Sequence, residues 1–220
     1  MRIIICGDST AASYDPAETL MTGWGQVLGE FIPEAEIRNH AMAGRSTRTF
    51  LEEGRLDRAM EDAGPGDLVL IQFGHNDENT EKPERYTEPE RAYPENLAVF
   101  VRRAREKQAV PVLMTPVCLR NWREEKLEPS HGIYPQKVRE TAEKLGTPLI
   151  DLYADSLRIV EAAGEAGSEK LFMNLDPGED PKYPEGREDN AHTRRAGAMA
   201  FAEKTAERLR ELNLTGPAKG

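Results

Sequence analysis

Four short polar segments carry side chains that together could support nucleophilic catalysis at a serine. Asp189 precedes His192 by three residues, so its carboxylate can accept a hydrogen bond from one imidazole nitrogen. The other nitrogen is then free to take a proton from the Ser9 hydroxyl. Gly44 permits its backbone N–H to approach a ligand closely, and the Asn76 amide can donate to a developing oxyanion. These residue types indicate acyl-transfer chemistry.

Each segment also has a purely structural interpretation. Ser9 could cap the helix that follows it, and Gly44 could serve a turn. Asn76 could tie its loop together through side-chain to backbone hydrogen bonds, and Asp189 could be a helix cap beside an exposed His192. Only the order and placement of all the segments together favour the chemical interpretation.

A metal-dependent hydrolase is an alternative function. His75 and Asp77 flank Asn76, and together with Asp189 and His192 they could act as metal ligands. One His-x-Asp pair is weak evidence for such a site. We therefore expect no metal.

Alternating strands and helices must position these side chains. Short apolar or β-branched runs predict five strands, at residues 2–6, 36–39, 68–73, 110–114 and 149–151. Amphipathic helices lie between them, and a long last helix follows residue 192. The pattern predicts a three-layer α/β/α sandwich of the flavodoxin-like type, with about five parallel strands. Residues 1–213 are expected to form one domain, and residues 214–220 a flexible tail.

The residues that could do chemistry follow the predicted strands or precede the last helix. Ligands of such sheets bind outside the carboxyl ends of the strands. Three long polar connections, at residues 75–94, 116–135 and 174–191, are placed to form the rim of a substrate site. Four side chains in these loops are candidates for binding a sugar, although they could equally pack the loops down: His75, Trp122, His131 and Tyr134.

The composition excludes some partners. The chain has 220 residues and a net charge of -10, which argues against nucleic acid or an anionic membrane as the main partner. No apolar run is long enough to cross a bilayer, and the N-terminus lacks the features of a secretory signal. We expect a cytoplasmic protein in which Cys6 and Cys118 are buried thiols. The oligomeric state is left open.

The segments, taken in order, resemble the sequence blocks of the SGNH (GDSL-type) hydrolase superfamily, whose namesake residues are Ser, Gly, Asn and His. They correspond to Ser9, Gly44, Asn76 and His192, and Asp189 completes the triad. The resemblance implies that Ser9 is the nucleophile and His192 its base. It also implies an oxyanion hole formed by the N–H groups of Ser9 and Gly44 with the Asn76 side chain, and no cofactor.

Three local segments look like the rhamnogalacturonan acetylesterase branch: Gly7-Asp8-Ser9-Thr10, Gln72-Phe73-Gly74-His75-Asn76-Asp77, and His131-Gly132 followed by Tyr134-Pro135. That branch implies removal of acetyl groups from a pectic oligosaccharide. The chain departs from the branch around the base: the branch often reads Asp-Gly-x-His-x-Asn, whereas this chain has Asp189-Asn190-Ala191-His192-Thr193-Arg194. The difference bears on substrate contacts near Arg194.

Other substrates and one other function class stay open. The same chemistry could act on acetylated xylan, a thioester, a lipid or another small acyl ester. The charged loops at residues 81–91 and 176–189 suit a lipid acyl chain poorly. A non-catalytic carbohydrate-binding protein on the same fold is the alternative of a different class.

Overall fold

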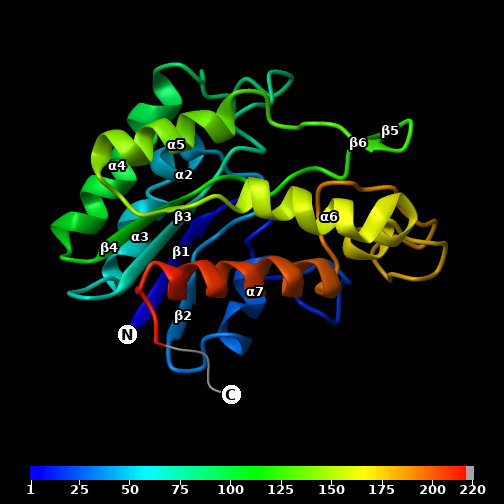
Figure 1. The fold of residues 1–220 in the computed structure, drawn as a ribbon, viewed down its shortest axis with the longest axis horizontal. Coiled ribbons are helices and arrows are strands. Elements are labelled where there is room, and N and C mark those ends of the chain that lie inside the picture. Colours follow the sequence, from blue (N-terminus) through cyan, green and yellow to red (C-terminus); the bar gives the residue numbers. More distant parts are fainter. Residues whose placement is uncertain (217–220) are drawn as a thin grey trace.

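A five-stranded parallel sheet forms the centre of the computed structural model, which describes residues 1–216 (Figure 1). Its strands are β1 Arg2–Gly7, β2 Glu36–Asn39, β3 Leu68–Gln72, β4 Val110–Met114 and β7 Leu149–Ile150. Their order in the sheet is β2-β1-β3-β4-β7, and each pairing is parallel. The five expected strands are confirmed, with ends that differ by at most one residue.

Helices cover both faces of this sheet. They are α1 Trp24–Val27, η1 Leu28–Glu30, α2 Thr47–Glu52, α3 Arg55–Asp62, α4 Ala92–Glu106, α5 Tyr134–Leu145, α6 Leu152–Ser168, η2 Glu169–Leu171 and α7 Arg195–Glu211. On one face, Ile3 and Ile5 of β1 share an apolar cluster with residues of α1, α6 and α7. On the other, Ile4 and Cys6 share a cluster with residues of α2 to α5. The predicted three-layer α/β/α sandwich is confirmed.

The register of the two central strands decides where the polar segments emerge. Gly7, the last residue of β1, pairs with Gln72, the last residue of β3. The chain enters the sheet at β1, adds β2 on one side and then β3 on the other. The carboxyl ends of β1 and β3 therefore border the point where the strand order reverses, which is where ligands bind in sheets of this kind.

Some elements differ from the sequence-based expectation. One of the amphipathic helices expected between the strands, that around Trp24, is a single α-helical turn followed by the 3₁₀ turn η1. Asp151, expected as the end of a strand, is instead the N-cap of α6, a helix for which no prediction was made. The 116–135 connection contains a small antiparallel hairpin of β5 Trp122–Arg123 and β6 Lys126–Leu127.

The expectations about the thiols, a membrane span, the tail and the domain have different outcomes. Cys6 and Cys118 are buried free thiols, as expected. Across residues 1–216 no helix is both long enough and apolar enough to span a bilayer. Of the expected flexible tail, Leu214 donates a backbone hydrogen bond to the carbonyl of Leu209, and residues 217–220 lie outside the described residues. The single domain over residues 1–213 stays a prediction.

Gly197 in α7 is packed so closely that an alanine there should destabilise the protein, although alanine usually stabilises a helix. A Cβ at Gly197 would lie 2.2 Å from the Leu171 carbonyl oxygen and 2.9 Å from Cγ2 of Thr193. We expect Gly197→Ala to lower the free energy of unfolding by about 1–3 kcal/mol, although alanine favours a helix by up to about 1 kcal/mol over glycine. Urea unfolding measures the change.

Gly167→Ala in α6 is the matched control, because its Cβ would meet only the Ala163 Cβ, at 3.8 Å. That variant should be as stable as the parent or more so. Stabilisation by both substitutions would contradict the close contact at Gly197.

Candidate active site

A relay of hydrogen bonds joins Ser9, His192 and Asp189 at the carboxyl edge of the sheet. The Nε2 atom of His192 lies 2.9 Å from Oγ of Ser9, and its Nδ1 lies 2.8 Å from Oδ2 of Asp189. Because a carboxylate only accepts hydrogen bonds, Nδ1 carries the proton and Nε2 can accept one from the serine. The three residues have the geometry of a serine nucleophile with an oriented general base.

Backbone contacts from two directions hold the histidine against the serine, 183 positions away. The Met173 N–H donates to the His192 carbonyl, at 2.9 Å. The next residue, Thr193, accepts from the Thr22 N–H at 2.9 Å and donates its hydroxyl to the Thr22 carbonyl at 2.6 Å. The Tyr14 hydroxyl donates to the Ser9 carbonyl at 2.8 Å. Hydrogen bonds to the backbone at and next to His192 and Ser9 thus fix the positions of the base and the nucleophile.

Asp189 is held as a carboxylate by its own loop. Its Oδ1 accepts from the backbone N–H groups of Ala191 and His192, at 2.9 and 3.0 Å. Burial opposes ionisation, but hydrogen bonds from the imidazole and these N–H groups outweigh it and lower the pKa of Asp189 to about 2. The carboxylate therefore stays charged at any pH at which the imidazole can act as a base.

Arg187 is a member of this network that sequence reasoning missed. Its guanidinium forms an ion pair with Oδ2 of Asp189, the oxygen that also contacts His192. The same guanidinium lies over the Tyr183 ring, 4.3 Å from its centroid. A lone arginine in a charged loop has no sequence signal that distinguishes it from its neighbours.

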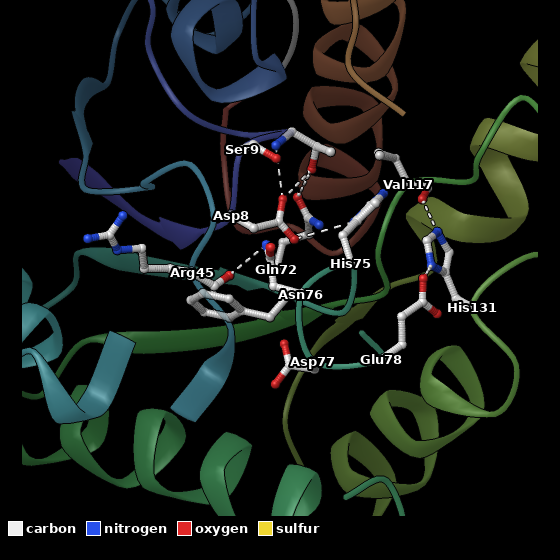
Figure 2. Close-up of polar contacts among 12 residues, drawn as sticks. Asp8, Ser9, Arg45, Gln72, His75, Asn76, Asp77, Glu78, Val117 and His131 are labelled. Carbon is white, nitrogen blue, oxygen red and sulfur yellow. Dashed lines mark hydrogen bonds and ion pairs between the residues drawn. The ribbon is translucent and has the colours of Figure 1, made fainter. Parts of the chain in front are cut away.

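The expected oxyanion donors lie beside the serine. Nδ2 of Asn76 donates one hydrogen to the Arg45 carbonyl at 3.1 Å, so the amide is oriented and keeps a second hydrogen for a ligand (Figure 2). Its Oδ1 is 3.4 Å from Nη1 of Arg85. Gly44 has φ +78°, and a Cβ there would lie 3.2 Å from the same Nη1. Arg85, which sequence analysis did not single out, thus packs against two of the three donors.

One cavity of about 360 Å³ brings most of these groups together. The residues that line it are Ser9, Ala43, Gly44, His75, Asn76, Glu78, Asn79, Lys82, Arg85, Leu119, Ala191 and His192. Each of the three long connections contributes to its wall, as expected of a substrate rim. Asp189 lies behind His192 and does not line the cavity.

A buried pair of charges lies beneath the serine. Oδ1 of Asp8 accepts from the N–H and hydroxyl of Thr10, at 2.9 and 2.7 Å, and Oδ2 is 3.4 Å from Nδ1 of His75 (Figure 2). Burial favours the neutral forms, but the charge of His75 keeps the pKa of Asp8 low and the charge of Asp8 keeps the pKa of His75 high. The pair ties the loop after β1 to the loop after β3.

The four expected sugar-binding residues do not lie together. His75 lines the cavity, whereas the other three are engaged in packing. His131 is buried against the His75 ring and contacts Glu78 and the Val117 carbonyl. The Tyr134 hydroxyl donates to two backbone carbonyls, and the Trp122 indole donates to Oγ of Ser168. A sugar contact by these three stays a prediction.

The alternative metal ligands are directed to different places. The Asp77 carboxylate accepts from the N–H and hydroxyl of Thr47 at the start of α2, away from His75 (Figure 2). In the part of the chain that the structure describes, no group of three or more His, Cys, Asp or Glu side chains could hold a metal ion.

Arg194, where the sequence departs from the branch it resembles, faces its own loop. Its guanidinium donates to the carbonyls of Phe172 and Asn174 and forms an ion pair with Glu179. The arginine thus helps to hold the connection that carries Asp189.

Known proteins are similar to this chain over nearly its whole length. A model of the GDSL-like Lipase/Acylhydrolase family matches residues 5–207. Rhamnogalacturonan acetylesterase RhgT of Bacillus subtilis is 43% identical over 216 residues, which cover 97% of this chain and 91% of the relative. The probable rhamnogalacturonan acetylesterase YesY of the same organism is 37% identical and covers 97% and 94%.

Solved structures share the fold. The YxiM protein of Bacillus subtilis superposes with a TM-score of 0.83 at 29% identity, over 98% of this chain and 57% of that chain. An acetylxylan esterase, Axe2 of Geobacillus stearothermophilus, superposes with a TM-score of 0.67 over 94% and 93%; at 17% identity it is evidence for the fold alone.

Arg187 and His192 contact the same oxygen of Asp189, so we expect Arg187 to affect the pH profile of catalysis. The positive charge of Arg187 repels the protonated imidazole. Arg187→Gln removes that charge, so protonation of the imidazole becomes more favourable. We expect the acid limb of kcat/KM to move up by about half a pH unit to one unit. Hydrolysis of an aryl acetate between pH 4 and 9 measures it. Arg187→Lys keeps the charge and should keep the limb in place; an unmoved or lowered limb in Arg187→Gln would contradict the coupling.

The low pKa of Asp189 predicts a stability difference that depends on pH. The carboxylate has a lower pKa in the folded chain than its ordinary 3.8, so its contribution is complete above pH 3.8 and is lost as the pH falls through about 2. Asp189→Asn should lower the free energy of unfolding at pH 7 by about 1–2 kcal/mol, and by less at pH 3. Urea titrations at both pH values test this. A larger difference in the free energy of unfolding between parent and variant at pH 3 than at pH 7 would refute it.

Proposed function

Because the chain belongs to the GDSL-like lipase/acylhydrolase family, we propose that it is a serine esterase that removes acetyl groups from rhamnogalacturonan-type oligosaccharides. The observation that carries this proposal is the relay from Asp189 through His192 to Ser9, which opens into a cavity lined by Asn76 and Gly44. Two relatives of nearly full length are named rhamnogalacturonan acetylesterase or probable rhamnogalacturonan acetylesterase. The enzyme is a carboxylic ester hydrolase.

The first half of the reaction transfers the acetyl group to the enzyme. Oγ of Ser9 attacks the acetyl carbonyl carbon while Nε2 of His192 takes the hydroxyl proton. The carbonyl oxygen becomes an oxyanion, which receives hydrogen bonds from the N–H groups of Ser9 and Gly44 and from Nδ2 of Asn76. His192 then gives its proton to the departing sugar oxygen, and an acetyl-enzyme is left.

The second half releases acetate. Water enters the cavity and loses a proton to Nε2 of His192 as it attacks the acetyl carbonyl. The second oxyanion occupies the same donors, and its collapse returns the proton to Oγ of Ser9. Asp189 stays ionised and balances the charge of the imidazolium in both halves.

The polar character of the cavity supports a carbohydrate rather than a lipid substrate. Glu78, Lys82 and Arg85 lie in its wall together with Asn76 and Asn79. A long acyl chain requires an apolar groove, and these side chains offer hydrogen bonds to hydroxyl groups instead. A role in pectin degradation and a cytoplasmic location stay predictions.

The nucleophile is tested by removal of its hydroxyl. Ser9→Ala should lower the rate of acetate release from an aryl acetate by about 10⁴-fold or more, because no other group forms the acyl-enzyme. We expect His192→Ala to be similarly impaired and Asp189→Asn to be less so. Ser13→Ala, at an exposed serine four residues away, is the matched control and should keep its activity.

The same assay separates the alternatives. Equal rates for Ser9→Ala and the parent would refute the serine mechanism. Acetylated oligosaccharides from rhamnogalacturonan and from xylan identify the substrate, with acetate as the readout. Binding of these sugars without acetate release would favour the non-catalytic alternative, and faster release from xylan would refute the rhamnogalacturonan proposal.

A further inference from the structure

A buried ion pair joins the two loops that carry the nucleophile and the oxyanion amide. Asp8 immediately precedes Ser9, and His75 immediately precedes Asn76. Oδ2 of Asp8 lies 3.4 Å from Nδ1 of His75, across the ends of β1 and β3 (Figure 2). The Asp8 side chain is fully buried, and that of His75 is 10% exposed. Neither side chain takes part in a step of the proposed chemistry.

One oxygen of Asp8 depends on His75 for its compensation. Oδ2 of Asp8 and both nitrogens of His75 are buried and have no hydrogen-bond partner in residues 1–216. Oδ1 of Asp8 accepts from the N–H and the hydroxyl of Thr10, which are neutral donors. If the imidazole lost its proton, the carboxylate would keep a buried charge whose second oxygen faces no donor, which is a costly arrangement in a protein interior.

A movement of this pair would reach the reacting groups directly. The Asp8 side chain spans the nucleophile, because it accepts from the N–H of Thr10 on the other side of Ser9. Ser9 supplies the attacking hydroxyl and one expected oxyanion donor, and Asn76 supplies another. A misplacement of about 1 Å between such groups can lower a rate by about 10²-fold.

A second histidine holds the ring of His75 from behind. The His75 and His131 rings pack edge to face, with their centroids 4.4 Å apart. Nε2 of His131 donates to the Val117 carbonyl at 2.8 Å, and its Nδ1 lies 2.9 Å from Oε1 of Glu78. Burial lowers the pKa of His131, and the charge of His75 lowers it further. Of the two imidazoles, His75 is thus the one that carries a proton.

Carboxyl groups face His75 from two loops. Asp8 lies in the loop after β1, and Asp77 and Glu78 follow His75 in its own loop. Burial lowers the pKa of His75, but the charges of these three groups outweigh burial and raise the pKa above its ordinary 6.5. The basic side chains in the wall of the same cavity are His192, from the segment before α7, and Lys82 and Arg85, from the loop of His75. The ion pair is therefore complete below pH 6.5 and is lost as the pH rises through the raised pKa of His75.

We infer that Asp8 and His75 are a positioning pair, which holds Ser9 against the oxyanion amide only while His75 carries its proton. The inference rests on the proposed function. His75 acts through Ser9 and Asn76, because its own nitrogens are buried away from the ester. Catalysis by Ser9 and His192 alone needs only a neutral base and gives an acid limb in the pH profile. The pair adds a base limb, with its midpoint above pH 6.5.

Two other interpretations predict different results. As a sugar contact, His75 would alter the KM for an oligosaccharide and not the pH profile for an aryl acetate. Asp77, whose pKa burial raises to about 7, could also titrate in this range, but its carboxylate accepts from Thr47 at the start of α2. Asp77→Asn should therefore retain a base limb, and loss of the limb in that variant would overturn its assignment to His75.

The test measures kcat and KM for an aryl acetate between pH 5 and 9. The parent should lose about tenfold in kcat along the base limb, with KM changed by less than about twofold. His75→Gln keeps an N–H for Asp8 but has no proton to lose, so it should lack the base limb and lower kcat at pH 7 by only about twofold to fivefold. His75→Ala should lower kcat by about tenfold or more at every pH below the limb.

The partner carboxylate gives a second, independent readout. Asp8→Asn removes the charge that favours the imidazolium, so burial then prevails at His75. The base limb should move down by about one pH unit or more. NMR titration of the His75 imidazole in the parent tests the pair without any variant, because its pKa should coincide with the midpoint of the base limb.

His40→Gln is the matched control, because His40 pairs with Asp62 at 2.7 Å outside the cavity. Its pH profile should equal that of the parent. A parent without a base limb, a base limb kept in His75→Gln, or a pKa of His75 below 6.5 would overturn the positioning pair and leave the esterase intact. No acetate release by the parent would overturn the proposed function and the positioning pair with it.

Discussion

The arrangement of the whole site depends on the parallel pairing of β1 with β3. Because Gly7 and Gln72 end their strands in register, the two chains leave the sheet side by side, one toward Ser9 and the other toward Asn76. A slip of one residue would move the side chains of each strand to the opposite face, so that the apolar clusters on both faces of the sheet would have to repack. The nucleophile and the amide that faces it are thus placed by the same apolar contacts that hold the sheet.

The general base His192 comes to this edge of the sheet from a distant part of the sequence, and its position depends on tertiary contacts. His192 belongs to a segment that precedes α7 and pairs with residues near Thr22 on one side and Met173 on the other. Neither contact is local in sequence. The relay therefore forms only when both segments have closed over the sheet, whereas the pair of Asp8 and His75 joins the first two loops directly.

The elements with strong local patterns were predictable, and those defined by their neighbours were not. Apolar runs such as 68–71 indicate strands because two covered faces demand them, and Pro135 with Gly146 sets the limits of α5. The hairpin at Trp122 lies in a long polar connection without such a period. The same holds for the site: residues next to strand ends were identifiable, but Arg187 and Arg85 depend on the path of a loop.

The closed base of the loop between Asp77 and Thr87 has a consequence for how such enzymes can diverge. Since the ends of the loop are joined to each other and to Tyr134, residues 79–84, which precede Arg85, can change in length and charge without a strain on β3 or α4. Insertions and deletions there are inexpensive, because closing a longer loop costs little additional entropy. The recognition of a new sugar can therefore be acquired by exchange of one short segment, while the machinery that breaks the ester is inherited unchanged.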